Sequence, residues 1–155
     1  MEILEDITVT VEIPSDDEGY VLLQCSICGN FFKATPRDIE DDGVLHLFCP
    51  SCGLSGDSFV TDDVLELGAT MLNNKVVDAI YDQFKDMERK TRKGPISVKA
   101  GKKPKHEPTD PIRSGIEALE VVGFMCCKRT AKVKPMFKMT GCYCPFCGVK
   151  NYEFE

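Results

Sequence analysis

The stretch Cys25-Ser26-Ile27-Cys28-Gly29 is followed, after nineteen further residues, by Cys49-Pro50-Ser51-Cys52-Gly53. Each block is a Cys-x-x-Cys pair followed by glycine. Such pairs form tight turns that point two sulfur atoms to one side, and the glycine can adopt the positive φ that lets backbone N–H groups approach the thiolates. Two such turns together supply four thiolates, the usual ligand set of a closed tetrahedral metal site. We therefore expect Cys25, Cys28, Cys49 and Cys52 to bind one metal ion.

Zinc is the metal that this ligand set favours, because four thiolates at about 2.3 Å complete its tetrahedral coordination. Such a closed site leaves no position for water or substrate, so its expected role is to stabilise a fold. Iron also accepts four thiolates, and an iron centre is the alternative that the ligand type leaves open.

The second half of the chain repeats this pattern. Residues 46–54 align with residues 141–149, and both contain Cys-Pro-x-Cys-Gly. The strand residues 21–24 align with residues 122–125, which immediately precede the next cysteines. We therefore expect a second four-cysteine site and two zinc ions per chain. Its predicted ligands are Cys126, Cys127, Cys144 and Cys147.

Five cysteines compete for the four positions of this second site. Adjacent strand residues point to opposite faces, so Cys126 and Cys127 can bind one ion only if the backbone turns there. Cys142 aligns with Leu47, an apolar strand position, and we expect it to be a small packed residue. The alternative is that Cys142 replaces Cys126 as a ligand.

The cysteine turns resemble those of the zinc-ribbon and rubredoxin-like superfamily, including transcription factor IIB-type ribbons. The resemblance rests on residues 49–54 and 144–150, and it covers about residues 20–60 and 120–155. It implies tandem zinc ribbons, and it is specific for metal binding but not for an activity. A rubredoxin would imply iron and one-electron transfer, but the chain has no tryptophan, and its first cysteine pairs are closer together than expected for that family. The overall pattern also resembles uncharacterised bacterial proteins with paired ribbons around a helix.

The nine cysteines gather mainly in Cys-x-x-Cys pairs, which favours metal thiolates in a reducing compartment over a disulfide framework. The first residues, Met1–Asp6, are acidic and do not resemble a signal peptide. No window approaches the roughly 18 apolar residues of a membrane span. We therefore expect a cytoplasmic protein that does not contact a membrane.

The net charge of −6 is unevenly distributed. Residues 1–66 carry 15 acidic and 2 basic side chains, residues 67–113 carry 6 and 11, and residues 114–155 carry 4 and 6. Between Arg89 and Lys105 there are eight basic residues and no acidic one. This separation suggests an acidic N-terminal segment and a basic central segment, which bind either each other or different partners.

Alternating patterns predict short strands around both metal sites. In the first half they lie at residues 7–13, 20–24, 31–34 and 44–48, and in the second at residues 121–125 and 130–134. The first two form a predicted hairpin over residues 7–24. Thr35 and Pro36 are typical of the N-cap and first residue of a short helical turn.

A different period begins at Asp62. Apolar residues recur three or four positions apart at Leu65, Ala69, Leu72, Val76, Ile80, Phe84 and Met87. They predict a helix from about Asp62 to about Arg92, roughly 45 Å long. The stripe is close to a heptad seam, so the helix either packs on a ribbon or pairs with a second helix. Residues 94–111 are rich in proline and predict a mobile linker.

These elements predict an α+β protein in which two small β zinc ribbons are joined by a long α-helix and a basic linker. The expected acidic zinc ribbon, with its leading β-hairpin, covers residues 1–60. The amphipathic helix covers residues 61–93, the flexible basic linker residues 94–113, and the C-terminal ribbon residues 114–155.

No catalytic residue is predicted, because neither histidine has a nucleophile at a motif spacing and no phosphate-binding glycine loop is present. The sequence favours a non-enzymatic zinc-binding adaptor or complex subunit with a protein partner, a nucleic-acid-associated complex being one setting. One alternative is direct nucleic-acid binding through the basic linker and the second ribbon. The others are a rubredoxin-like electron-transfer protein and a homodimer through residues 62–92. The basic residues of the second ribbon are Lys128, Arg129, Lys132, Lys134, Lys138 and Lys150.

Overall fold

The computed structural model describes residues 7–112, 115 and 118–155. They divide into two compact units. The sheet unit contains residues 13–62 and the chain from residue 112 onward, and the hairpin unit contains residues 63–111 with the N-terminal segment up to residue 12. The acidic residues 1–6 and the predicted start of the C-terminal ribbon at Ser114 lie outside the described residues.

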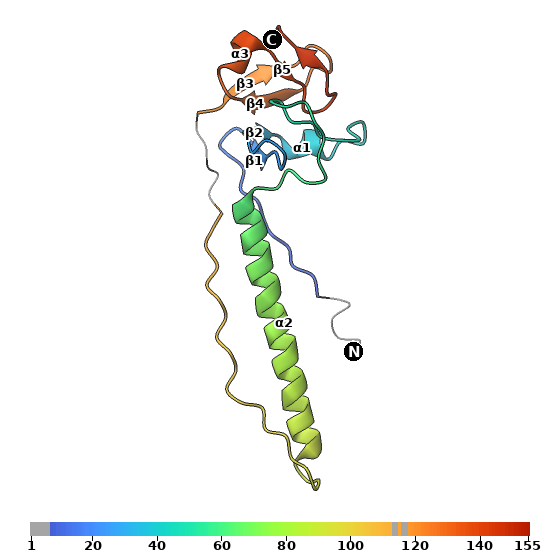
Figure 1. Cartoon of the computed structure of the whole chain (residues 1–155), viewed down its shortest axis with the longest axis vertical. Helices are drawn as coiled ribbons and strands as arrows, with labels where there is room; N and C mark the ends of the chain where they lie inside the picture. The colour runs from blue at the N-terminus through green and yellow to red at the C-terminus, as the bar shows by residue number, and fades with distance from the viewer. Residues whose placement is uncertain (1–6, 113–114, 116–117) are drawn as a thin grey trace. The chain divides into compact units, whose positions relative to one another are not determined.

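The sheet unit is built on a four-stranded antiparallel sheet in the order β1-β2-β4-β3 (Figure 1). Strands β1 (Val21–Gln24) and β2 (Phe31–Ala34) flank the first cysteine turn, and β3 (Glu120–Gly123) and β4 (Thr130–Val133) flank the turn with Cys126 and Cys127. Strands β2 and β4 pair directly, so the two cysteine-containing halves share one sheet. The predicted α+β class, with a long helix between the two cysteine groups, is confirmed.

The two halves of the sheet unit match element by element, with β1 equivalent to β3 and β2 equivalent to β4. The equivalent residues Lys33 and Lys132 face each other in the antiparallel β2–β4 pair. Reciprocal hydrogen bonds follow the same relation. The Phe48 N–H donates to the Pro145 carbonyl at 2.8 Å, and the Tyr143 N–H donates to the Pro50 carbonyl at 3.0 Å. The two cysteine-containing halves of the sheet unit are therefore related by an approximate internal two-fold axis.

The core of the sheet unit follows from the two-residue period of its strands. In β1 the buried side chains are Val21 and Leu23, and in β4 they are Ala131 and Val133. The rings of Phe32 and Phe59 meet edge to face with centroids 5.7 Å apart. These side chains join the buried cysteines in one cluster, so the hydrophobic core and the cysteine groups are continuous.

Four short elements complete the sheet unit. They are α1 (Pro36–Ile39), α3 (Phe137–Thr140), β5 (Cys142–Tyr143) and β6 (Lys150–Asn151). Helix α1 begins as predicted, with the Thr35 side chain accepting the Asp38 N–H at 3.3 Å and Pro36 as the first helical residue. Strands β5 and β6 pair around the last cysteine turn.

Two predicted strands do not form. Residues 7–14 contain no strand, and the predicted hairpin is reduced to a single bridge between Ser15 and Val21. Residues 7–12 belong to the hairpin unit instead, where the Thr8 carbonyl accepts a hydrogen bond from Lys75. An alternating pattern also suits an extended segment that lies along a helix.

The predicted strand at residues 44–48 is likewise wrong, because only Phe48 forms a bridge, with Ser55. The Phe48 N–H donates to the carbonyl of Pro145, which lies in the other half of the sheet unit. Leu45, which the pattern placed in a strand, is 84% exposed.

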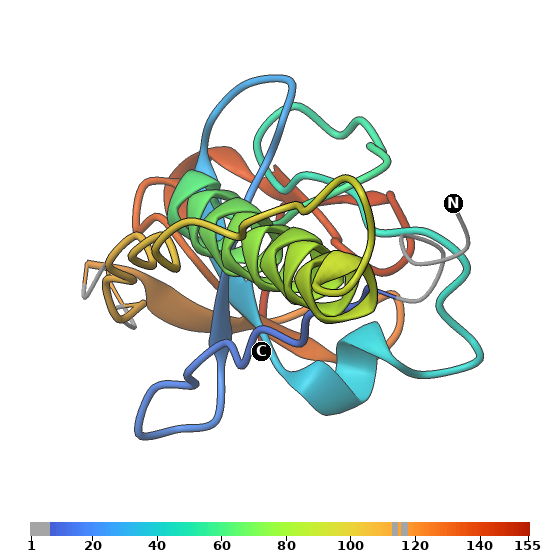
Figure 2. The ribbon, with the colours of Figure 1, turned by 90° about the horizontal axis from the view of Figure 1, so that it is seen from below.

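In the hairpin unit, helix α2 covers Asp62–Thr91, as predicted. Residues 94–111 have no regular secondary structure, but they turn back and run along α2 (Figures 1 and 2). Asn74 exchanges two hydrogen bonds with the backbone of Glu107, at 3.0 and 2.9 Å. Asp78 pairs with both Lys103 and His106 at 2.9 Å. The segment predicted as a linker is therefore bound along α2, and we call it the return arm.

Among the described residues, no helix combines the length and apolarity needed to cross a bilayer.

Candidate metal centres

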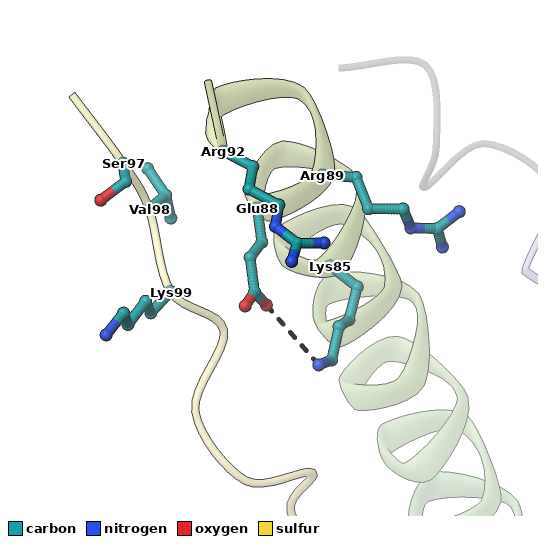
Figure 3. Close-up of a pocket in the computed structure, with 7 residues that line it drawn as sticks. All are labelled: Lys85, Glu88, Arg89, Arg92, Ser97, Val98 and Lys99. Carbon is teal, nitrogen blue, oxygen red and sulfur yellow. Dashed lines mark ion pairs between the residues drawn. The ribbon is translucent and has the colours of Figure 1, made fainter. Parts of the chain in front are cut away.

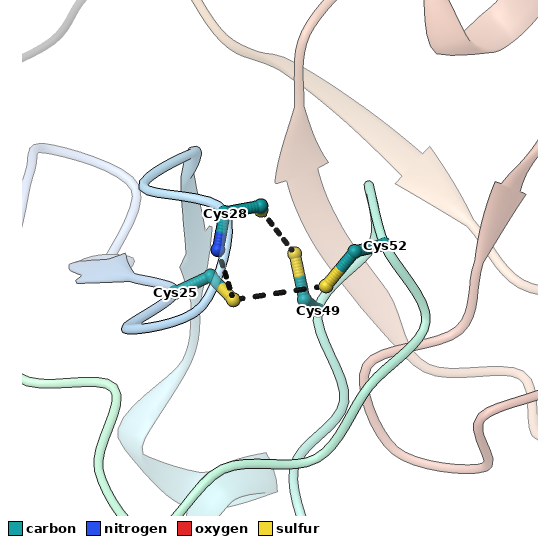
Figure 4. A group of neighbouring side chains, drawn as sticks. All are labelled: Cys25, Cys28, Cys49 and Cys52. Carbon is teal, nitrogen blue, oxygen red and sulfur yellow. Dashed lines mark hydrogen bonds between the residues drawn. The ribbon is translucent and has the colours of Figure 1, made fainter.

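The first cysteine group joins two turns of the sheet unit (Figure 4). Cys25 and Cys28 lie between β1 and β2, whereas Cys49 and Cys52 follow Phe48. Their four sulfur atoms lie within 4.8 Å of one another, with Cys25 Sγ 3.8 Å from Cys52 Sγ and Cys28 Sγ 3.5 Å from Cys49 Sγ. Four thiolates about 2.3 Å from a zinc ion would form a tetrahedron with edges of about 3.8 Å. The two measured distances are close to this edge length, so the group could hold a metal ion.

Backbone hydrogen bonds hold the first turn in place. The Cys25 N–H donates to the Asn30 carbonyl at 3.0 Å, and the Gly29 N–H donates to the Cys25 carbonyl at 2.9 Å. Gly29 has φ +74°, the conformation predicted for it. The N–H groups of Ile27 and Cys28 point at Cys25 Sγ from 3.4 and 3.5 Å. Two backbone donors of the turn therefore converge on this sulfur atom.

The second group brings together Cys126, Cys127, Cys144 and Cys147, whose sulfur atoms also lie within 4.8 Å of one another. The Cys127 and Cys144 sulfur atoms are 3.6 Å apart. The turn between β3 and β4 repeats the bonds of the first turn. The Phe124 N–H donates to the Arg129 carbonyl at 2.9 Å, and the Lys128 N–H donates to the Phe124 carbonyl at 2.8 Å.

This equivalence shows why adjacent cysteines can serve one site. Phe124 occupies the backbone position of Cys25, and Cys127 occupies that of Cys28. Cys126 therefore stands at the position of Ile27, within the turn, where the backbone reverses. The predicted alignment of residues 21–24 with residues 122–125 is wrong by two positions, since β1 matches residues 120–123.

Phe124 replaces a sulfur ligand with a core side chain. It is fully buried, and its ring meets Phe154 edge to face with centroids 5.8 Å apart. Lys128 takes the place of Gly29 and has φ +60°, an uncommon conformation for a residue with a Cβ atom. The second turn therefore keeps the backbone of the first while moving one cysteine forward by two residues.

Cys142 lies apart from both groups. It belongs to β5, is 1% exposed and packs in the core, as predicted from its alignment with Leu47. Burial raises the pKa of its thiol to about 11, so it stays protonated at neutral pH. A buried neutral thiol behaves as a small apolar side chain.

The equivalent thiols of the two groups show the same pattern of acidity. Burial opposes ionisation of Cys28, but hydrogen bonds from the Asn30 N–H and from the Cys49 and Cys25 thiols outweigh it and lower its pKa to about 7. The pKa of Cys127 is also lowered, by hydrogen bonds that outweigh burial. Burial raises the pKa of their partners Cys49 and Cys144. Each group therefore contains one thiol whose pKa is lowered and a neighbouring thiol whose pKa is raised.

The two groups interlock through glycine and aromatic residues. A Cβ atom on Gly53 would lie 2.8 Å from the Tyr143 ring, and one on Gly148 would lie 3.0 Å from the Phe48 ring. Each glycine follows a cysteine pair, and each aromatic residue precedes the pair of the other half. Packing around one group therefore depends on the other.

One residue that organises this unit was missed from sequence. The Oδ2 atom of Asp16 accepts hydrogen bonds from Lys33 at 3.2 Å and from Lys132 at 2.7 Å. Its Oδ1 accepts the Tyr20 and Glu18 N–H groups. Burial opposes ionisation, but these bonds outweigh it and hold the pKa of Asp16 well below its usual range. A carboxylate thus joins the paired lysines of β2 and β4.

Comparisons of the chain with protein-family models, with curated proteins and with solved structures find no match. The description of the two groups as centres that could bind metal therefore rests on their sulfur geometry. Both predicted sets of four cysteines are brought together, and Cys142 is not among them.

Proposed function

We propose that this protein is a non-enzymatic zinc-binding adaptor or complex subunit that holds two zinc ions. The observation that carries the proposal is that each group brings four cysteine sulfur atoms within 4.8 Å of one another. Four protein ligands complete the coordination of zinc and leave no position for a substrate or a reactive water. The interlocked packing of the two groups supports a structural role for both ions.

The chemistry of the sulfur atoms supports a reducing compartment, and we place the protein in the cytoplasm. The Cys28 and Cys49 sulfur atoms are 3.5 Å apart, whereas a disulfide bond is about 2.05 Å long. Clustered thiols that bind metal are typical of proteins in reducing compartments, where cysteines stay reduced.

Helix α2 supports a role in protein association. The large apolar side chains of its stripe are between 40% and 55% exposed, and they are Leu65, Leu72, Ile80, Phe84 and Met87. A row of apolar side chains three, four, seven or eight residues apart suits a second helix. We propose that a second copy of this chain pairs along α2, which would make the protein a dimer with four zinc ions.

Native mass spectrometry with elemental analysis tests this function on the full chain. We expect two zinc ions per chain and a dimer mass. The Cys25→Ser variant should lose one zinc ion, whereas the matched Cys142→Ser variant should keep both. Iron in the purified protein would overturn the zinc proposal and favour the electron-transfer alternative. A monomer at all concentrations would overturn the pairing of α2.

A further inference from the structure

Positive charge concentrates where α2 ends and the return arm begins. Residues 85–105 contain nine lysines and arginines and only two acidic residues, Asp86 and Glu88. We call this segment the basic turn. It belongs entirely to the hairpin unit and carries none of the cysteines discussed above.

Hydrogen bonds fix the backbone of the basic turn. The Thr91 hydroxyl donates to the Met87 carbonyl at 2.8 Å and accepts the Val98 N–H at 3.1 Å. The Ala100 N–H donates to the Glu88 carboxylate at 3.3 Å. The basic side chains therefore project from a backbone that is already folded, which lowers the entropy lost when they bind a ligand.

An open cavity of about 590 Å³ lies between the last turns of α2 and the return arm (Figure 3). Its wall contains Lys85, Glu88, Arg92, Ser97, Val98 and Lys99. The Arg92 side chain extends along the helix toward Lys85 and Glu88, whereas Arg89 points away from the arm. Beside the Lys85–Glu88 ion pair, the wall presents the cations Arg92 and Lys99 and the Ser97 hydroxyl, which suit an anion.

Most cations of the basic turn have no carboxylate partner. Lys85 pairs with Glu88, Arg89 with Asp86, and Lys103 with Asp78. The other six form no ion pair with any carboxylate of the described residues. They are Lys90, Arg92, Lys93, Lys99, Lys102 and Lys105.

Five cations of the sheet unit are different, because each has a polar partner within the unit. Lys128 pairs with Glu155, Arg129 with Asp41, Lys132 with Asp16, and Lys138 with Glu120. Lys134 donates to the Asn30 side chain at 2.6 Å. Partners within the unit therefore neutralise or engage these cations, and the basic turn remains the concentrated source of unpaired positive charge.

We propose that the basic turn binds the phosphate backbone of a nucleic acid. The unpaired cations Lys99, Lys102 and Lys105 follow an extended arm that spans up to about 20 Å, so they match a linear polyanion with one phosphate every 3.4 Å along each strand. Arginine at the cavity can bind a phosphate through two hydrogen bonds. No aromatic residue lies within the basic turn, so the contact is to phosphates and is independent of base sequence.

Fluorescence anisotropy with a short labelled DNA duplex tests this proposal on the zinc-loaded full chain. Binding should weaken steeply between about 50 and 200 mM salt. The double variant Arg92→Gln and Lys99→Gln should bind at least about tenfold more weakly. Its log–log salt slope should be shallower by about 1.8, because two phosphate contacts are lost. Its zinc content should not change, so failure here is distinguishable from failure of the zinc proposal.

The matched control is Lys128→Gln with Lys138→Gln, which removes the same charge from the sheet unit. The proposal predicts binding within about twofold of the parent chain, since these lysines already have partners. Equal weakening of both variants would mean that only net charge matters and would overturn the proposal. Binding to anionic lipid vesicles or to a polyglutamate peptide, without binding to the duplex, would also overturn it.

Discussion

Replacing Asp16 with asparagine should destabilise the sheet unit strongly, although Asp16 contacts no cysteine sulfur in the described residues. The change keeps the size of the side chain but removes the negative charge that Lys33 and Lys132 share. The Lys33 side chain is only 5% exposed, and no other carboxylate of the described residues lies within ion-pair distance of it. The variant would therefore leave a buried ammonium group unpaired.

Removing one partner of a buried ion pair costs about 3–5 kcal/mol. Lys132 would keep its second partner, Glu18, at 2.9 Å, which limits the loss. We therefore expect the free energy of unfolding to fall by about 3 kcal/mol, the lower end of that range. With a urea dependence of about 2 kcal/mol per molar, the midpoint should fall by about 1.5 M.

Urea unfolding followed by circular dichroism measures this change, with free zinc held constant because bound metal adds to stability. The matched control is Asp17→Asn, an exposed neighbour for which we expect a change below about 0.5 kcal/mol. The double variant Asp16→Asn with Lys33→Met should recover most of the loss, because the unpaired charge is gone. A change below about 1 kcal/mol for Asp16→Asn alone would refute the reasoning.

The difference in the free energy of unfolding between the parent chain and Asp16→Asn depends on pH, and the pKa shifts of Asp16 and Lys132 give the direction. The pKa of Asp16 is lowered on folding, so its contribution is complete above the unfolded value of about 3.9 and is lost as the pH falls through the folded pKa. The pKa of Lys132 is raised, so its contribution is complete below about 10.4 and is lost as the pH rises further. The stability difference between the parent chain and Asp16→Asn should therefore be constant between about pH 6 and pH 9.

Three further predictions concern the metal centres and α2. Cobalt titration of Cys126→Ser should show loss of one tetrahedral thiolate site. An unchanged spectrum would mean that another cysteine, and not Cys126, is the ligand. Gly148→Ala should destabilise the protein by about 1–3 kcal/mol in thermal unfolding, because its φ is +72° and a Cβ atom would crowd Phe48. Leu72→Glu should abolish any concentration-dependent dimer in sedimentation, while zinc content stays at two per chain.

Local sequence patterns predicted the features that depend on neighbouring residues. The spacing within each cysteine pair and the period of α2 both act over a few positions, and the structure has both groups and the helix. Asp16 could not be identified in this way, because its partner Lys132 is 116 residues away. The role of Phe124 was hidden for a similar reason. Only the backbone bonds of the β3–β4 turn reveal that it stands where Cys25 stands in the first turn.

The position of Asp16 also determines which halves of the protein can associate. In the β2–β4 pair, Lys33 and Lys132 face each other, and the N-terminal half alone supplies the carboxylate between them. If two C-terminal halves met in the same way, their Lys132 side chains would oppose each other without that carboxylate, and like charges in directly opposed strand positions repel. Asp16 therefore favours pairing of the N-terminal half with the C-terminal half of the sheet unit. Pairing of two C-terminal halves is disfavoured, because it lacks this carboxylate.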